Sequence, residues 1–234
     1  MKKLKITAAL CALLLLTGCA SLLERQYSTV EPHSSKFWES EAADTLRAEN
    51  HQDLVNDLLL LIDEVQTGIG RTGSLFCFQQ YGIKPDVVSM AKGLGGGVPI
   101  GAVMAADTCD TVLGPGTHAT TFGGTPMICA AANAVLSEVT QPEFLKSVTE
   151  KGEYLKAKIL GFGSDKVKDV RGMGLMLGIV VDADARAALV KEIMDAGVLV
   201  LTAGTNAIRL LPPLSISYEE MDEALAVMQK VFCK

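Results

Sequence analysis

Two stretches of sequence decide the fold: LLIDEVQTG at residues 60–68 and SMAKGLGGGVPIG at residues 89–101. The first is a run of aliphatic residues that ends in the carboxylate of Asp63, which is typical of a buried strand. In the second, Lys92 follows a predicted strand and precedes a run of glycines, which let a flat ligand approach the backbone. Ligands of open α/β sheets bind at the carboxyl ends of the strands. We therefore expect Asp63 and Lys92 to lie at a ligand-binding edge of a sheet.

From residue 58 onward, apolar runs alternate with glycine-rich turns and amphipathic segments, which indicates an α/β domain. Strands are predicted at Leu58–Ile62, Asp86–Ser89, Ile100–Ala105, Val167–Val170, Leu175–Val181, Val198–Leu201 and Ala207–Leu211. Helices are predicted at Pro126–Val139, Pro142–Ile159, Ala183–Ala196 and Tyr218–Phe232. Glycines stand where these helices should end, at Gly161, Gly163 and Gly197.

Composition narrows the classes of function. With 49% hydrophobic residues among 234, the chain can bury a core and does not have the composition of a disordered protein. A net charge of −6 and an aromatic content of 5% argue against a surface that binds nucleic acids. Six scattered cysteines form no CxxC pair, so neither a disulfide scaffold nor a metal site is predicted.

The N-terminus has the pattern of a bacterial lipoprotein signal. Residues 1–19 combine a lysine-rich head, an apolar run too short to span a bilayer, and a Leu-Thr-Gly-Cys end that resembles a lipobox. This pattern predicts cleavage before Cys19, lipidation of that cysteine and anchoring to a membrane. The alternative is a plain buried apolar helix. Residues 20–57 are polar and charged, are predicted to be partly helical, and are unrelated in character to residues 58–234.

A lysine among glycines at the edge of a sheet suits imine chemistry. Its amine forms a Schiff base when it is partly neutral, which burial or a neighbouring positive charge favours. A pyridine ring that carries an aldehyde would react with Lys92, and Asp63 would pair with the protonated ring nitrogen. The cofactor that we expect is therefore pyridoxal 5'-phosphate (PLP).

Five blocks in order then point to a family: DEVQTG at 63–68, GRTG at 70–73, AKGLGGG at 91–97, TFGG at 121–124 and RLLPPL at 209–214. Together they resemble the class III PLP-dependent aminotransferases, and among these the acetylornithine aminotransferases most closely. The resemblance implies a partial fold-type-I large domain with a mostly parallel sheet at residues 58–144, and a small α+β domain at residues 145–234. It also implies amino transfer from acetylornithine or ornithine to 2-oxoglutarate, in arginine biosynthesis, by a cytoplasmic enzyme.

The resemblance further implies roles for residues around the cofactor. Lys92 would bind the cofactor aldehyde and then carry the proton to and from the substrate. Asp63 would hold the pyridine nitrogen, so that the ring remains an electron sink. Val65 would pack on the face of the ring, and Gln66 would hydrogen-bond its phenolic oxygen.

Two more implied roles concern a second subunit and the substrate. Thr121 would reach the cofactor phosphate of the neighbouring subunit, which implies a homodimer. Arg209 would bind the substrate carboxylate, because its forked donors match that group. Taken singly, each site residue has an ordinary alternative as a helix cap, a surface lysine or half of a surface ion pair. Because they occur together and in the family's order, the class III aminotransferase interpretation is favoured.

One motif suggests a different fold, and several parts that the family supplies are missing ahead of Asp63. The GxGxxG match at residues 68–73 does not follow its strand directly, which argues against a dinucleotide fold. Ahead of Asp63 we find no phosphate-cradling turn, no aromatic to stack on the ring and no substrate arginine of the kind the family supplies. We therefore expect a truncated or fused copy with impaired activity, joined within the leucine run at residues 58–61. The alternative is a lipid-anchored binding or structural module without catalysis.

Overall fold

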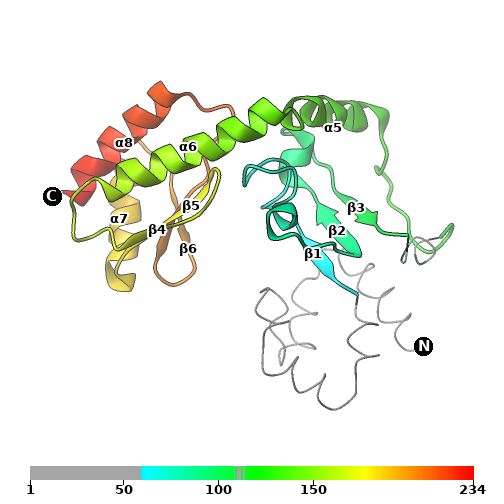
Figure 1. Cartoon of the computed structure of the whole chain (residues 1–234), viewed down its shortest axis with the longest axis horizontal. Coiled ribbons are helices and arrows are strands. Elements are labelled where there is room, and N and C mark those ends of the chain that lie inside the picture. Colours follow the sequence, from blue (N-terminus) through cyan, green and yellow to red (C-terminus); the bar gives the residue numbers. More distant parts are fainter. Residues whose placement is uncertain (1–58, 108, 110–111, 113) are drawn as a thin grey trace, which may run out of the picture. The chain divides into compact units, whose positions relative to one another are not determined.

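Figure 1 shows the computed structural model of the chain, which describes residues 59–107, 109, 112 and 114–234. The predicted signal at residues 1–19, its Cys19 and the polar segment at residues 20–57 lie outside the described residues. The described residues fall into two compact units.

The first unit comprises the described parts of Met1–Ile62, Pro85–Ser89 and Ala102–Gly123. It holds most of a three-stranded sheet in the order β1 (Leu61–Asp63), β2 (Val87–Met90) and β3 (Ala102–Ala105). The Leu60 amide donates to a carboxylate oxygen of Asp86 at 2.9 Å, and the Leu60 carbonyl accepts from the Asp86 and Val87 amides. Because Leu60 is bonded in this irregular way, β1 begins at Leu61, and the predicted start at Leu58 lies outside the described residues.

The second unit comprises Asp63–Lys84, Met90–Gly101 and Gly124–Lys234. Two short 3-10 helices belong to it, η2 (Cys77–Tyr81) and η3 (Lys92–Gly95). Its α-helices are α5 (Pro126–Val139), α6 (Pro142–Leu160), α7 (Ala183–Asp195) and α8 (Tyr218–Phe232). An antiparallel sheet of the order β4-β5-β7-β6 completes it, with strands β4 (Asp169–Met173), β5 (Met176–Val180), β6 (Leu201–Ala203) and β7 (Ala207–Leu210).

One face of the antiparallel sheet is covered by helices α6, α7 and α8. Alternate residues of the two central strands point into this layer and are buried, as the period of a strand requires: Leu177, Ile179, Ile208 and Leu210. Helix α8 contributes a buried stripe at helical spacing, which consists of Met221, Leu225, Met228 and Phe232. The resulting core is one continuous cluster of buried side chains, which joins the sheet and its three helices.

The helix ends follow local sequence signals. Helices α5 and α8 begin and end at the predicted residues. Proline occupies the first turn of α5, and α8 starts with a capping box in which the Glu220 amide donates to the Ser217 hydroxyl at 3.1 Å. In return, the Ser217 amide donates to the Glu220 carboxylate at 2.8 Å. These bonds satisfy amides that a helix leaves unpaired at its start.

Two strands of the second unit are displaced from their predicted positions by hydrogen bonds outside the ladder. The Val198 amide donates to the Ile193 carbonyl at the end of α7, so β6 starts only at Leu201. The Val167 amide donates to the Ser164 carbonyl in a turn, so β4 runs over Asp169–Met173.

A tight backbone junction lies at the β4–β5 turn. Gly174 occupies this turn at φ 51°, in the left-handed region that favours glycine. A Cβ added to Gly174 would lie 2.7 Å from the Arg71 carbonyl oxygen, and one added to Gly152 of α6 would lie 2.7 Å from the Gly174 carbonyl carbon. The Leu175 amide also donates to the Arg71 carbonyl at 3.0 Å. Three backbone segments therefore meet where no side chain fits, and we call this contact the Gly174 junction.

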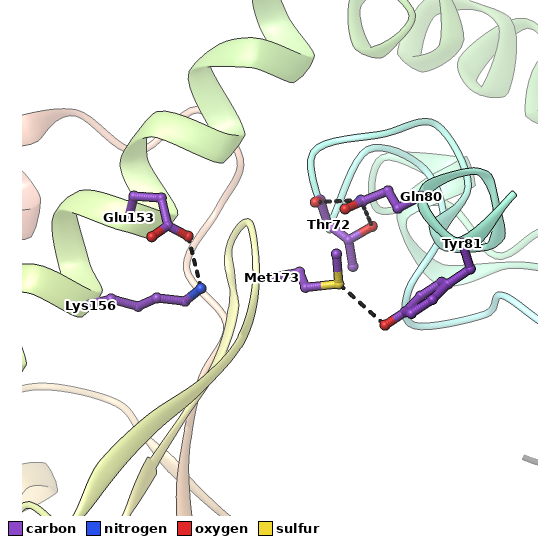
Figure 2. A network of polar contacts seen from close by, with 6 residues as sticks. All are labelled: Thr72, Gln80, Tyr81, Glu153, Lys156 and Met173. Atoms are coloured by element: carbon purple, nitrogen blue, oxygen red, sulfur yellow. Dashed lines mark hydrogen bonds and ion pairs between the residues drawn. The ribbon is translucent and has the colours of Figure 1, made fainter. Parts of the chain in front are cut away.

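Side chains around the Gly174 junction add polar contacts, which Figure 2 shows. The Gln80 amide donates to the Thr72 carbonyl at 2.8 Å and to the Thr72 hydroxyl at 3.1 Å. At the end of the β4–β5 hairpin, the Met173 sulfur accepts from the Tyr81 hydroxyl at 3.5 Å. The bond between Tyr81 and Met173 attaches residues 72–81 to the antiparallel sheet.

The Gly174 junction predicts the effect of adding one methyl group. Gly174→Ala should lower the free energy of unfolding by about 2–5 kcal/mol, from left-handed strain and overpacking together. Gly152→Ala should also destabilise, although helix propensity alone would stabilise an alanine there by about 1 kcal/mol. Urea denaturation measures both changes.

Gly178 of β5 provides the matched control. A Cβ at this position would lie 3.5 Å from the Ala207 Cβ, which is an ordinary contact. Gly178→Ala should therefore leave the unfolding free energy unchanged or raise it slightly. Equal stability of all three variants would contradict the Gly174 junction.

Candidate active site

The loop that follows β1 is built around Asp63 and Glu64. The side chain of Asp63 is exposed, and its Oδ1 accepts a hydrogen bond from the Val65 amide at 2.9 Å. Glu64 is buried, with 1% of its surface exposed. Its Oε1 accepts from the Phe78 amide at 2.8 Å, and its Oε2 accepts from the Thr67 hydroxyl. The buried carboxylate thus ties the loop to η2 and fixes the backbone that carries Val65 and Gln66.

Lys92 and Ile69 have unusual backbone angles. Among the described residues, they are the only non-glycine residues with positive φ, 47° for Lys92 and 55° for Ile69. Ile69 is buried, and its Cβ lies 3.6 Å from where a Cβ on Gly93 would be. Left-handed geometry costs a β-branched residue about 1–3 kcal/mol and persists only where the surroundings hold it. Such strain is concentrated at functional sites, which makes this pair a candidate.

A cavity of about 560 Å³ lies beside this pair, within the second unit. Loop residues, η3, helices α5 and α6, and the segment after β7 form its walls: Val65, Gln66, Gly68, Ile69, Arg71, Lys92, Gly93, Gly96, Ala134, Val135, Glu138, Val139, Phe144, Leu211, Leu214 and Ser215. The volume is within the usual range for sites that bind small molecules. Three of the lining residues are ionisable, Arg71, Lys92 and Glu138, and two of these three are basic, which favours an anionic ligand.

Arg209, which belongs to β7, contacts the loop that follows β1. Its Nη1 donates to the Gln66 Oε1 at 3.3 Å. Its Nε is buried and has no hydrogen-bond partner among the described residues. A buried unpaired donor costs about 1–3 kcal/mol, so it needs an explanation. A bound carboxylate is one acceptor that would satisfy it.

The structure brings together some of the residues expected from the sequence. Lys92, Val65 and Gln66 line the cavity, and Arg209 contacts Gln66. Asp63 is not among the lining residues. Thr121 is exposed and belongs to the first unit, so its role stays a prediction.

Sequence reasoning missed three residues of the site. Glu64 and Arg71 stand inside the quoted blocks, but nothing in their spacing reveals a buried carboxylate or a cavity wall. Glu138 lines the cavity from helix α5, and a sequence gives no signal for that position. No group of three or more His, Cys, Asp or Glu side chains able to hold a metal ion occurs in the described part of the chain. Within that same part, no helix has the length and apolar character needed to cross a membrane.

Comparison with known proteins decides the family. The sequence profile of Aminotransferase class-III matches residues 48–232. The chain belongs to the class-III aminotransferases. Among curated class-III relatives, the chain is 49% identical over 179 residues to an acetylornithine aminotransferase of Streptococcus mutans, covering 76% of this chain and 47% of that protein. It is 46% identical over 173 residues to the enzyme of Bacillus subtilis, covering 74% of this chain and 45% of that protein.

Solved structures of class-III enzymes confirm the α/β fold. The N-acetylornithine aminotransferase of Stenotrophomonas maltophilia superposes with a TM-score of 0.70 at 32% identity, over 80% of this chain and 50% of that one. An ornithine aminotransferase of Toxoplasma gondii, described with partial occupancy of PLP at its active site, gives 0.71 at 31% identity, over 80% and 46%. The predicted PLP fold-type-I class is confirmed. The chain spans about half the length of the curated relatives it matches.

The loop geometry makes a prediction about Cys77, which follows Phe76 at the start of η2. Burial raises the pKa of the Cys77 thiol, the Thr72 hydrogen bond opposes this, and the negative charge of Glu64 raises it further. Below the raised pKa the thiol stays protonated and unreactive. Alkylation by iodoacetamide should therefore have its pH midpoint higher in the folded protein than in the same protein in urea.

A variant separates the charge effect from the burial effect. Glu64→Gln removes the negative charge, so it should move the Cys77 midpoint down toward that of the unfolded chain. Peptide mass spectrometry resolves Cys77 from the exposed Cys233, which serves as the internal reference. A folded midpoint at or below the unfolded one would contradict the loop structure.

Proposed function

We propose that this chain binds PLP in the cavity and carries out amino transfer of the acetylornithine and ornithine type, with 2-oxoglutarate as acceptor. One observation supports the proposal above all others. Lys92 is held in a strained conformation on the wall of a cavity that Val65 and Gln66 also line. Family membership supplies the chemical context, because the relatives described above are acetylornithine aminotransferases.

The residues present fit a flat, anionic cofactor. Gly68, Gly93 and Gly96 line the cavity without bulk, and the charged lining residues favour an anion. When bound, PLP supplies an aldehyde for a lysine amine and a pyridinium ring that accepts electrons from the substrate. The residues proposed to hold it are Lys92 and Val65.

The remaining roles belong to the same proposal. Gln66 would donate to the phenolic oxygen of the ring, Asp63 would pair with the ring nitrogen, and Thr121 of a second copy would bind the phosphate in a homodimer. Lys92 would move the proton to and from the substrate carbon that bears the reacting amine.

Arg209 supports binding of an amino-acid substrate. Its buried Nε has no partner among the described residues, and its Nη1 already contacts a side chain of the cavity. A carboxylate would accept from Nε and Nη2, which share one edge of the guanidinium, in the forked geometry that arginine favours, while Nη1 keeps its bond to Gln66. We propose Arg209 as the residue that binds the substrate carboxylate.

We propose that the chain binds PLP but catalyses amino transfer only weakly. Lys92, Val65 and Gln66, which are proposed to contact the cofactor, all line the cavity, whereas Arg209 alone is proposed to bind the substrate. The fusion hypothesis remains a prediction. It is tested by resequencing the gene across the leucine run at residues 58–61, where an intact upstream half in frame would refute it.

Titration with PLP tests the proposal directly. Wild-type protein should gain imine absorbance, and borohydride should then fix the cofactor mass on the peptide that contains Lys92. Lys92→Ala should abolish both signals, while Lys84→Ala, which removes an exposed lysine that does not line the cavity, should keep them.

The same experiment addresses the alternative of a lipid-anchored module without catalysis. That alternative predicts no absorbance change and incorporation of labelled lipid at Cys19, and this result would refute the enzymatic proposal. Labelled lipid together with trapped cofactor would place an active site on an anchored protein.

A further inference from the structure

We propose that Arg71 is a positioning residue, which holds the segment carrying Arg209 at the correct distance from the loop carrying Val65 and Gln66. The proposal rests on the function proposed above. It assigns a role to a cavity residue that sequence reasoning did not single out. Arg71 acts through Arg209, and it is not proposed to touch the reacting atoms.

The first support is the hydrogen bonding of the Arg71 guanidinium. Its Nη1 donates to the Pro212 carbonyl at 2.5 Å and to the Leu175 carbonyl at 3.3 Å. The Leu175 amide donates back to the Arg71 carbonyl at 3.0 Å. One residue therefore joins three segments that lie far apart in the sequence, namely the loop after β1, the β4–β5 turn and the segment after β7.

The second support is the electrostatic setting. Arg71 is half-buried and forms no ion pair with an acidic side chain among the described residues; burial lowers its pKa. A guanidinium held by neutral carbonyls keeps its positive charge and its planar fork. Lysine could preserve the charge, but its single ammonium on a flexible stem does not reproduce the fork.

The third support is the path from Arg71 to the substrate residue. Pro212 follows Arg209 by three positions, and the neighbouring Leu211 and Leu214 line the cavity. Arg209 in turn donates to Gln66 on the opposite wall. Hydrogen bonds and the chain together form a closed path. It runs by a hydrogen bond from Arg71 to Pro212, along the chain to Arg209, by a hydrogen bond to Gln66, and along the loop back to Arg71. Releasing Pro212 therefore loosens the chain just after β7, three positions from Arg209, whose own backbone stays paired with β5 and β6.

Hydrogen exchange of the cofactor-free, full-length protein gives the first readout. Arg71→Gln should speed exchange in peptides covering residues 207–216, and Arg71→Lys should have a smaller effect in the same direction. Arg171→Gln is the matched control, because Arg171 is exposed and pairs only with Asp169 at 3.2 Å among the described residues. Unchanged exchange at residues 207–216 in both Arg71 variants would overturn the proposal.

Ligand binding gives the second readout. A purely structural role of Arg71 would weaken the binding of PLP and of glutarate alike. PLP affinity of Arg71→Lys, which keeps the positive charge on the cavity wall, should stay close to wild type, whereas the affinity of the PLP-loaded protein for glutarate should fall by about tenfold. Equal loss of PLP and glutarate binding would show a general structural role and overturn the proposal. If Arg71→Lys fails to fold, the exchange of Arg71→Gln at residues 207–216 decides the proposal.

The two proposals fail in different ways. A wild-type protein that captures no PLP refutes the proposed function, but the exchange experiment still decides the linkage between Arg71 and residues 207–216. A wild-type protein that captures PLP, with variants that bind glutarate as tightly as wild type, refutes the role of Arg71 alone.

Discussion

The structure of the site depends on a backbone contact that excludes side chains, the Gly174 junction. Gly174 packs on the Arg71 carbonyl, and Gly152 of helix α6 packs on Gly174. The antiparallel sheet and its helices thereby meet the loop that carries Val65, Gln66 and Arg71. This contact positions two walls of the cavity, which are the loop and the segment after β7.

Polar groups fix the site around the junction. The buried carboxylate of Glu64 is paired with a backbone amide and a hydroxyl, which offsets the cost of burying it. Arg71 is paired with carbonyls in the same way. These bonds hold the loop in place around Ile69, which keeps a left-handed conformation there.

Much of the fold is predictable from sequence because its signals are local. Helices α5 and α8 have the predicted bounds, and a proline and a capping box mark where they begin. The starts of β1, β4 and β6 differ from prediction because Leu60, Val167 and Val198 are bonded outside the ladders. A sequence pattern shows which residues are apolar, but not which backbone amides are already hydrogen-bonded in a turn or at a helix end.

The candidate site divides in the same way. Lys92, Val65 and Gln66 could be predicted because contiguous motifs carry them, and they line one cavity. Asp63 could be placed at the end of β1, but the hydrogen bond from the Val65 amide that orients its carboxylate could not be foreseen. The partners of Arg71 lie 104 and 141 positions along the chain, and only folding brings them together.

A crystal structure of the borohydride-reduced, PLP-treated chain tests the account most directly. It should show continuous density from the Lys92 Nζ into the cavity beside Val65, with the Asp63 carboxylate turned to the ring nitrogen. Density for the cofactor on any other lysine, or a Lys92 side chain that points away from the cavity, would contradict the account.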